Sequence, residues 1–248
     1  MQASRGAIDG PRLRGDRQES NVTVSAISSV LEEGAFEEEG QRRFSPPAYR
    51  LLEAADQLFH SQGVPATTVR EITSACGLSP GALYNHFNSK DDLLYVLVGH
   101  RHLRLEREVI AAQKLVVGDP IAEFVAIIGV YVRAHAAGRQ GALVASREYR
   151  HLSRSRRDEV IVIRRRLRDR MVAVLRRGSR GGVFDISGGS DRKSLIITAA
   201  TILEMCINCS QWFRPEGKMT IEELEQLFIE LSLRMVGCGP AAGREGSA

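Results

Sequence analysis

The stretch 79–94, which reads SPGALYNHFNSKDDLL, constrains the fold more than any other part of the chain because it carries two helix starts in quick succession. Ser79 suits an N-cap, and Pro80 suits the first helical position because its missing N–H would be unpaired there anyway. Ser89 can cap the next helix, with Asp92 completing a capping box. The pattern predicts a short helix followed almost at once by a long one.

A further helix start lies just upstream. Thr68 and Glu71 have the spacing of a capping box, and the helix that they open runs through Ile72 and Ala75. Gly77 then permits the left-handed backbone that ends many helices. A helix, a tight glycine turn and a second helix follow one another in the order of a helix-turn-helix motif.

The short second helix of this motif has two different faces. Leu83 and Phe87 are four residues apart and point inward, whereas Tyr84 and Asn85 lie on the opposite face. Asparagine can contact adenine through two hydrogen bonds, and tyrosine, histidine and lysine suit phosphate oxygens. Lys90 opposes the dipole of the next helix but suits a phosphate drawn to that helix start.

Residues 67–94 resemble the DNA-binding segment of the TetR family of transcriptional regulators, and the resemblance extends over a preceding helix at 47–62 that Gly63 ends. Its most specific part is the Leu-Tyr-x-His-Phe core followed by Ser-Lys. Asn85 lies where the family varies, so the operator sequence stays open. With Ser79 added at the helix start, the residues expected to face DNA are Thr68, Arg70, Ser79, Gly81, Ala82, Tyr84, Asn85, His86 and Lys90.

Composition agrees with this interpretation without requiring it. The 248-residue chain has a formal charge of +4, which permits binding of nucleic acid or an anionic ligand. No apolar run approaches the roughly 20 residues that cross a bilayer, and the start of the chain lacks a signal peptide, so we expect a cytoplasmic protein without a membrane partner.

The apolar pattern after residue 94 keeps a helical period, which predicts an all-α fold. We expect a disordered tail at 1–45, either functional or the product of an upstream start codon, a helix-turn-helix domain at 46–94, a helical ligand-binding and dimerisation domain at 95–237, and a flexible tail at 238–248. Helices of the second domain are expected at 91–113, from Pro120 to Gly138, at 142–151, from Arg156 to a stop at Gly178, at 191–213 and at 220–236.

The last two of these helices are apolar beyond one face. In TetR-like regulators such helices pair with their two-fold mates as a four-helix bundle, which implies a homodimer and a palindromic operator in double-stranded DNA. Cys206 and Cys209 lie in the first of the two helices and are interpreted as small buried residues at the dimer seam. No metal-ligand spacing, nucleophile elbow or phosphate-binding glycine loop is present, so we expect no enzyme, metal or cofactor.

Two local patterns, 147–153 and 211–218, resemble a TetR branch that includes regulators of lipid and steroid breakdown, many of which respond to acyl-CoA thioesters. An acyl chain needs an apolar tunnel, which Phe124, Ile128 and Tyr131 are expected to line. A CoA head needs arginines at its mouth, for which Arg133, Arg147 and Trp212 are the candidates. Ordinary packing or an intramolecular ion pair is the alternative for each.

Two other features of the second domain have competing interpretations. His135 lies on an apolar helix and is expected to be a satisfied core or pocket residue rather than a metal ligand. The arginines of the run 164–170 lie off the apolar stripe of their helix, so we expect a solvated face, with phosphate binding as the alternative.

The function that these features predict is a repressor that leaves its operator when a small molecule binds. An activator or a corepressor-dependent regulator has the same sequence features. A more distant alternative is an all-helical enzyme or interaction module in which Tyr84 and His86 serve another partner.

Overall fold

The structure, a computed structural model, describes residues 44–238, so the two expected tails lie almost wholly outside it. Every regular element in this range is a helix, which confirms the all-α prediction. In chain order the elements are α2 (Pro46–Ala66), α3 (Val69–Ala75), α4 (Pro80–Leu83), α5 (Lys90–Leu115), α6 (Pro120–Ala137), α7 (Arg139–Arg147), the 3-10 helix η1 (Glu148–His151), α8 (Arg154–Arg180), α9 (Arg192–Trp212) and α10 (Ile221–Met235).

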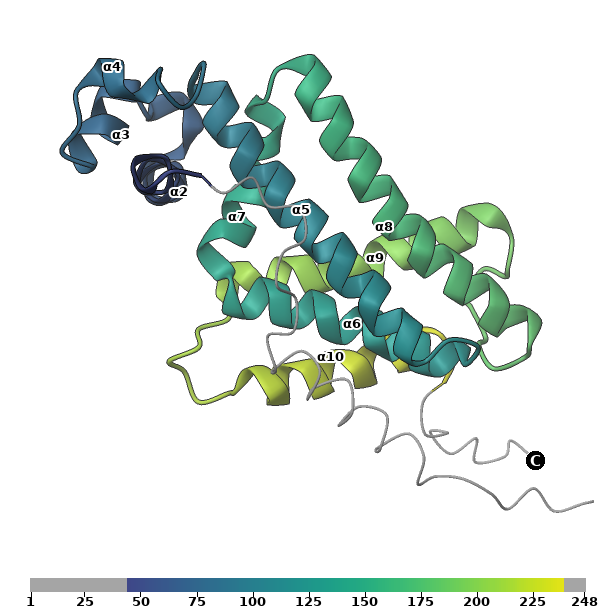
Figure 1. The fold of residues 1–248 in the computed structure, drawn as a ribbon. Helices are drawn as coiled ribbons and strands as arrows, with labels where there is room; N and C mark the ends of the chain where they lie inside the picture. The colour runs from purple at the N-terminus through teal and green to yellow at the C-terminus, as the bar shows by residue number, and fades with distance from the viewer. Residues whose placement is uncertain (1–43, 239–248) are drawn as a thin grey trace, which may run out of the picture.

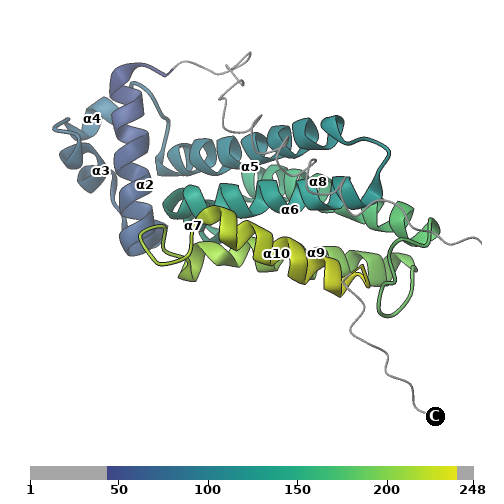
Figure 2. The same ribbon diagram turned by 90° about the horizontal axis from the view of Figure 1, so that it is seen from below.

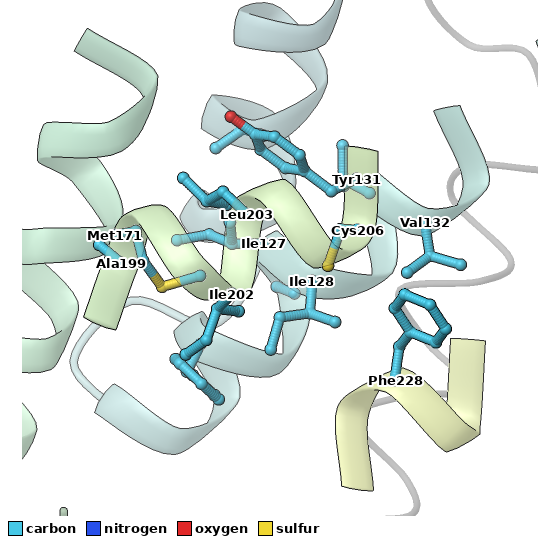
Figure 3. Packing of buried hydrophobic residues seen from close by; sticks show 14 of the residues in the cluster. Ile127, Ile128, Tyr131, Val132, Met171, Ala199, Ile202, Leu203, Cys206 and Phe228 are labelled. Carbon is cyan, nitrogen blue, oxygen red and sulfur yellow. The ribbon is translucent and has the colours of Figure 1, made fainter. Parts of the chain in front are cut away.

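Helices α2, α3 and α4 form a small head at one end of the molecule, and α5 runs from the head along the larger helical body (Figure 1). In the body, α6 packs against α5, α8, α9 and α10, and α10 lies along its outer side (Figure 2). Apolar side chains from α6, α9 and α10 meet in the centre of the body (Figure 3).

The core of the head continues into the body. Its centre is formed by Leu51, Phe59, Ile72 and Leu83, all at most 1% exposed. The same cluster also includes buried residues from the body helices, namely Val144, Leu152 and Val160. The head is therefore docked against α7, η1 and α8 through apolar contacts as well as through α5.

Several helix ends form as the sequence predicts. The Thr68 hydroxyl oxygen accepts from the Glu71 N–H at 3.2 Å, and the Glu71 carboxylate accepts from the Thr68 N–H at 2.7 Å. Gly77 has φ 67°, which a side chain would strain. Gly63, with φ 80°, interrupts the helical backbone of α2 close to its end, although the helix label extends to Ala66.

Two predicted caps are wrong in detail. Ser79 is at the N-cap position of α4 but makes no side-chain cap hydrogen bond. Ser89 caps α5 by accepting from the Asp92 N–H at 3.1 Å, but the Asp92 carboxylate accepts from the Asn88 N–H and does not complete the box. The same Asp92 oxygen also accepts from the side-chain amide of Asn88, at 3.3 Å.

Gly178 does not stop α8, contrary to the prediction. The helix continues to Arg180, and the left-handed turn follows at Gly182 with φ 70°. A Cβ on Gly178 would lie 2.1 Å from Cδ2 of Phe184, a buried ring of the body core. The glycine is thus needed for close packing of this ring rather than for helix termination.

The shorter helix predicted at 142–151 begins earlier and ends differently. Its α-helical part is α7, and the chain then tightens into η1 before α8 begins. The sequence contains no glycine or proline at the junction that marks this change.

Cys206 and Cys209 are both 0% exposed within one protomer, so their placement at a dimer seam is wrong. Both belong to the core cluster of the body, where Cys206 lies near Ile128 of α6 (Figure 3). Burial raises the pKa of Cys209 to about 12 and raises that of Cys206 as well. The two cysteines are small buried residues as predicted, but they lie in the core of the body and not at a dimer interface.

Two helices, α6 and α9, are long and apolar enough by composition to cross a membrane, contrary to the expectation from the sequence. About two thirds of the apolar window of α6 is buried in the core, so packing accounts for its composition. Only 39% of the corresponding window of α9 is buried, which leaves an apolar face of α9 outside the core.

Candidate nucleic-acid interface and effector cavity

The exposed face of α4 and the turn after it carries three polar side chains side by side. Tyr84 is 59% exposed, and Asn85 and His86 are exposed with it. Leu83 and Phe87, which flank them in the sequence, are 0% and 3% exposed and anchor the segment in the head core. The predicted division into an inner and an outer face is therefore confirmed, although α4 itself ends at Leu83 and a turn carries the rest.

The start of α3 lies beside this face and contributes Thr68 and Arg70, both exposed. The Thr68 hydroxyl is engaged in the capping box, whereas Arg70 has no ion-pair partner among residues 44–238. An exposed guanidinium at this place can contact a phosphate.

The small residues of α4 leave room for a partner. A Cβ on Gly81 would meet no protein atom within 4 Å, so nothing in the fold of the head requires a glycine there. Ala82 is half-buried, and the hydroxyl of Ser79 is free of a capping bond. The small side chains of these three residues allow a nucleic-acid backbone to approach the start of α4 closely.

Contacts behind this face extend to the beginning of the described chain, which sequence reasoning missed. The Phe44 ring lies 5.9 Å from Phe87 and 5.8 Å from Tyr49, measured between centroids. His86 Nδ1 lies 3.4 Å from the Ser45 hydroxyl. Phe44, Tyr49 and Phe87 come together only in the folded structure, so the sequence does not reveal that they support the exposed face.

Lys90 does not extend freely toward solvent. Its ammonium group donates to the carbonyl oxygens of Val64, at 2.7 Å, and Thr67, at 2.6 Å. The lysine therefore ties the start of α5 to the end of α2. A phosphate contact, which remains a prediction, can use the third N–H of the ammonium group.

A cavity of about 630 Å³ lies in the body between α5, α6, α7, α8 and α9. Apolar side chains including Leu105, Val130 and Leu203 form part of its wall. Its charged lining is mainly basic, with Glu108 and Glu204 as the carboxylates. The basic residues are Arg101, Arg104, Arg133, Arg164, Arg165 and Arg168.

Of the six residues expected at a ligand site, Tyr131 and Arg133 line this cavity. Phe124 and Ile128 are 0% exposed and belong to the core instead, because α6 is covered by helices on most sides and only its last turns reach the cavity.

The other two expected ligand residues lie away from the cavity. Arg147 donates to the Gln211 amide oxygen at 2.7 Å. Trp212 is 55% exposed and packs beside Phe213 and Phe228. Neither belongs to the cavity lining, so the structure does not bring these two residues together with Tyr131 and Arg133.

The arginine run of α8 is not simply a solvated face. Arg166 makes two hydrogen bonds of 2.6 Å to Glu106, which hold the pKa of that carboxyl below its usual range. Arg170 donates to Gln113, and Arg164 lies over the Tyr149 ring with its carbon 4.9 Å from the centroid. Arg165 and Arg168 line the cavity. The expectation that the arginine run is only a solvated face is therefore wrong.

Two buried histidines line the cavity in the neutral form. Burial lowers the pKa of both His102 and His135 to about 4. Each donates its Nδ1–H to the carbonyl oxygen four residues earlier, at 2.8 Å for Val98 and 2.7 Å for Tyr131, so Nε2 is the acceptor. The prediction of His135 as a satisfied pocket residue is confirmed.

An ion pair between Arg133 and Glu225 joins the cavity wall to α10. Gly129 makes room for it, since a Cβ there would lie 2.6 Å from the Glu225 carboxylate. The Nε and Nη2 atoms of Arg133 are buried without a partner among the described residues. No group of three His, Cys, Asp or Glu side chains in the described range could hold a metal ion.

Two family models match the chain. "Bacterial regulatory proteins, tetR family" matches residues 51–96, and "Tetracyclin repressor-like, C-terminal domain" matches residues 117–236. The transcriptional repressor KstR2 of Rhodococcus jostii is 28% identical over 189 residues, which cover 74% of this chain and 87% of the relative.

Solved structures agree with these matches. A tetR-family regulatory protein from Rhodococcus RHA1 is 30% identical, with a TM-score of 0.72 over 79% of this chain and 100% of the other. PfmR of Thermus thermophilus is 32% identical, with a TM-score of 0.62 over 75% and 97%. AibR, solved with isovaleryl coenzyme A and operator DNA, shares the fold at 19% identity, a TM-score of 0.66 and coverage of 75% and 97%.

Proposed function

Because this chain belongs to the TetR family of bacterial transcriptional regulators, we propose that it is a dimeric repressor that a small molecule releases from a palindromic operator. The observation that carries DNA binding is the exposed Tyr84–Asn85–His86 face beside the start of α3. The relatives named above are regulators, so we propose no catalytic activity, and we place the protein in the cytoplasm.

The dimer is proposed to form through α9 and α10. Large apolar side chains remain exposed on both helices although each helix also contributes to the core: Ile197 and Trp212 on α9, and Leu227, Leu231 and Met235 on α10. The three on α10 are spaced by four residues and share one face. Pairing of these faces across a two-fold axis would cover them and hold two heads at the spacing of successive major grooves, about 34–36 Å.

The proposed effector is an amphiphile with an apolar chain and an anionic head, for which an acyl-CoA thioester is the leading candidate. The cavity of about 630 Å³ combines an apolar wall with six arginines and two glutamates. Its neutral histidines add hydrogen-bonding groups without a net charge. Such a lining favours an anion over a cation and admits a chain beside it.

Selection of bound sequences from random duplexes tests DNA recognition first. We expect a palindrome whose affinity falls steeply as salt rises, because phosphate contacts release counterions. Titration of the bound operator with acetyl-, octanoyl- and palmitoyl-CoA then tests the effector. Failure to enrich any palindrome would overturn the proposed function, whereas tighter operator binding with a thioester would indicate a corepressor instead.

A further inference from the structure

Arg101 of α5 connects the effector cavity to the DNA-binding head. It lines that cavity, and it also lines a second hollow of about 480 Å³ between the head and the body. In this second hollow its Nη2 lies 3.4 Å from Oδ2 of Asp56 on α2. One side chain is therefore accessible to a molecule in the body and paired with the longest helix of the head.

The position of Arg101 is built into the backbone of α7. A Cβ on Gly141 would lie 1.7 Å from the Cζ atom of Arg101, so the guanidinium lies directly on the helix where the glycine leaves space. Any other residue at position 141 would displace it. This fit is independent of the ion pair and shows that the fold reserves a place for the side chain.

Asp56 depends on this arrangement. Its side chain is 14% exposed, and its Oδ2 accepts from Arg101 and, at 3.3 Å, from the Gln140 amide. Its Oδ1 is buried without a partner among the described residues. Withdrawal of Arg101 would leave a mostly buried carboxylate with the Gln140 amide as its remaining partner, which disfavours the docked position of α2.

We infer that Arg101 is the positioning residue through which an anionic effector in the cavity controls the head: the anion attracts the guanidinium away from Asp56, and α2 loses its tie to the body. This inference rests on the proposed function for its effector. The Arg101–Asp56 ion pair is present in the effector-free protein. A substitution that breaks this pair should therefore weaken operator binding, as the effector does.

The chain offers matched controls. Arg107 also lies on α5, but it is exposed and lines neither hollow. Gly99 is also a helical glycine of α5, but a Cβ there would meet nothing within 4 Å. Arg107→Gln and Gly99→Ala therefore reproduce the chemistry of Arg101→Gln and Gly141→Ala without disturbing the tie to α2.

The first experiment needs no effector. Operator dissociation constants are measured for full-length Arg101→Gln, Asp56→Asn, Gly141→Ala and the Arg101→Gln/Asp56→Asn double variant, with thermal melts to establish folding. Each single change should weaken binding about fivefold to tenfold, the double variant should be no weaker than the singles, and the controls should stay within about twofold. Wild-type affinity in Asp56→Asn, or effects that multiply in the double variant, would overturn the inference.

The second experiment uses octanoyl-CoA and palmitoyl-CoA. Asp56 lines only the second of the two hollows and competes with the effector for Arg101, so Asp56→Asn should bind the thioester at least as tightly as wild type does. The factor by which the thioester weakens operator binding should nevertheless fall at least about threefold, which a purely structural role would not cause. An unchanged factor contradicts the inference. If neither thioester releases the wild type, the proposed effector fails while the first experiment still decides the role of Arg101.

Discussion

At the scale of single residues, the head presents a contact surface whose members have different tasks. Asn85 and Arg70 are exposed and have no side-chain ion pair or hydrogen bond among the described residues, whereas Thr68 and Lys90 are engaged inside the domain. We therefore expect the first two to act mainly on DNA and the last two partly through the fold.

Asn85→Ala should weaken binding to the selected operator by about 1–3 kcal/mol and leave binding to unrelated duplex unchanged, because an amide reads a base edge. Arg70→Ala should weaken both and reduce the slope of log affinity against log salt by about 1. Fluorescence anisotropy at several salt concentrations measures both effects. An equal loss on operator and unrelated duplex for Asn85→Ala would contradict base readout.

The histidines of the cavity predict a pH dependence of stability. Because the pKa of His102 and His135 is lowered to about 4 in the folded protein, the unfolded chain binds more protons between that value and its ordinary 6.5. Stability from these groups is complete above pH 6.5 and is lost as pH falls toward 4, by up to about 3 kcal/mol for each.

Urea unfolding at pH 7 and pH 5 tests this dependence. The difference between the two should be smaller in a His102→Gln/His135→Gln variant than in wild type. Substitution of the exposed His60 by glutamine serves as the control and should leave the difference as it is. If the double variant shows the same difference in stability between pH 7 and pH 5 as wild type, other groups cause the acid sensitivity.

At the scale of helices, the sequence patterns predicted which helices form and in what order. They were less successful in predicting the structural role of individual glycines. Capping boxes at Thr68 and Thr220 are local, so the sequence alone reveals them. Gly178 also looked like a helix stop, but its partner Phe184 becomes a neighbour only after the chain turns back. The partners of the cavity arginines are likewise distant in sequence, so the sequence showed the arginines but not the groups that they contact.

Gly178→Ala should lower the free energy of unfolding by about 1–3 kcal/mol, because the new methyl group forces the Phe184 ring from its place. Gly181→Ala, where a Cβ meets only backbone oxygens at 3.4 Å or more, is the matched control. Denaturant unfolding of both variants measures the difference. Equal stability of the two would indicate that the ring repacks freely.

Lys90→Met should destabilise the head by about 1–3 kcal/mol, since two charge-assisted hydrogen bonds to the end of α2 are lost while the aliphatic stem is kept. Thermal unfolding and operator affinity should therefore both decline. A loss of affinity with unchanged thermal stability would instead assign Lys90 to phosphate binding alone.

At the scale of the whole molecule, the exposed apolar residues of α9 and α10 form a face that no other described part of the protomer covers. Sequence periodicity indicated that these helices are buried on more than one side. It could not separate core positions such as Cys206 from exposed positions such as Ile197, because both are apolar and differ only in which way they point.

Leu231→Glu should convert the protein to monomers and weaken operator binding by about a hundredfold, because a carboxylate on the proposed interface opposes its burial. Val117→Glu places the same charge on an apolar residue that is 80% exposed at the turn after α5, and should leave the dimer intact. Sedimentation at several protein concentrations measures both. A Leu231→Glu variant that remains dimeric would place the interface elsewhere.

Helix α5 reaches without interruption from the head into the body. Its 26 residues make a rod of about 39 Å at 1.5 Å per residue. A tilt of about 5° at one end of such a rod displaces the other end by about 3 Å. In the proposed dimer, two rods related by a two-fold axis would change the separation of their tips by up to about twice that amount. A rearrangement no larger than a side-chain movement beside α5 is thereby magnified into a mismatch with the pitch of the double helix.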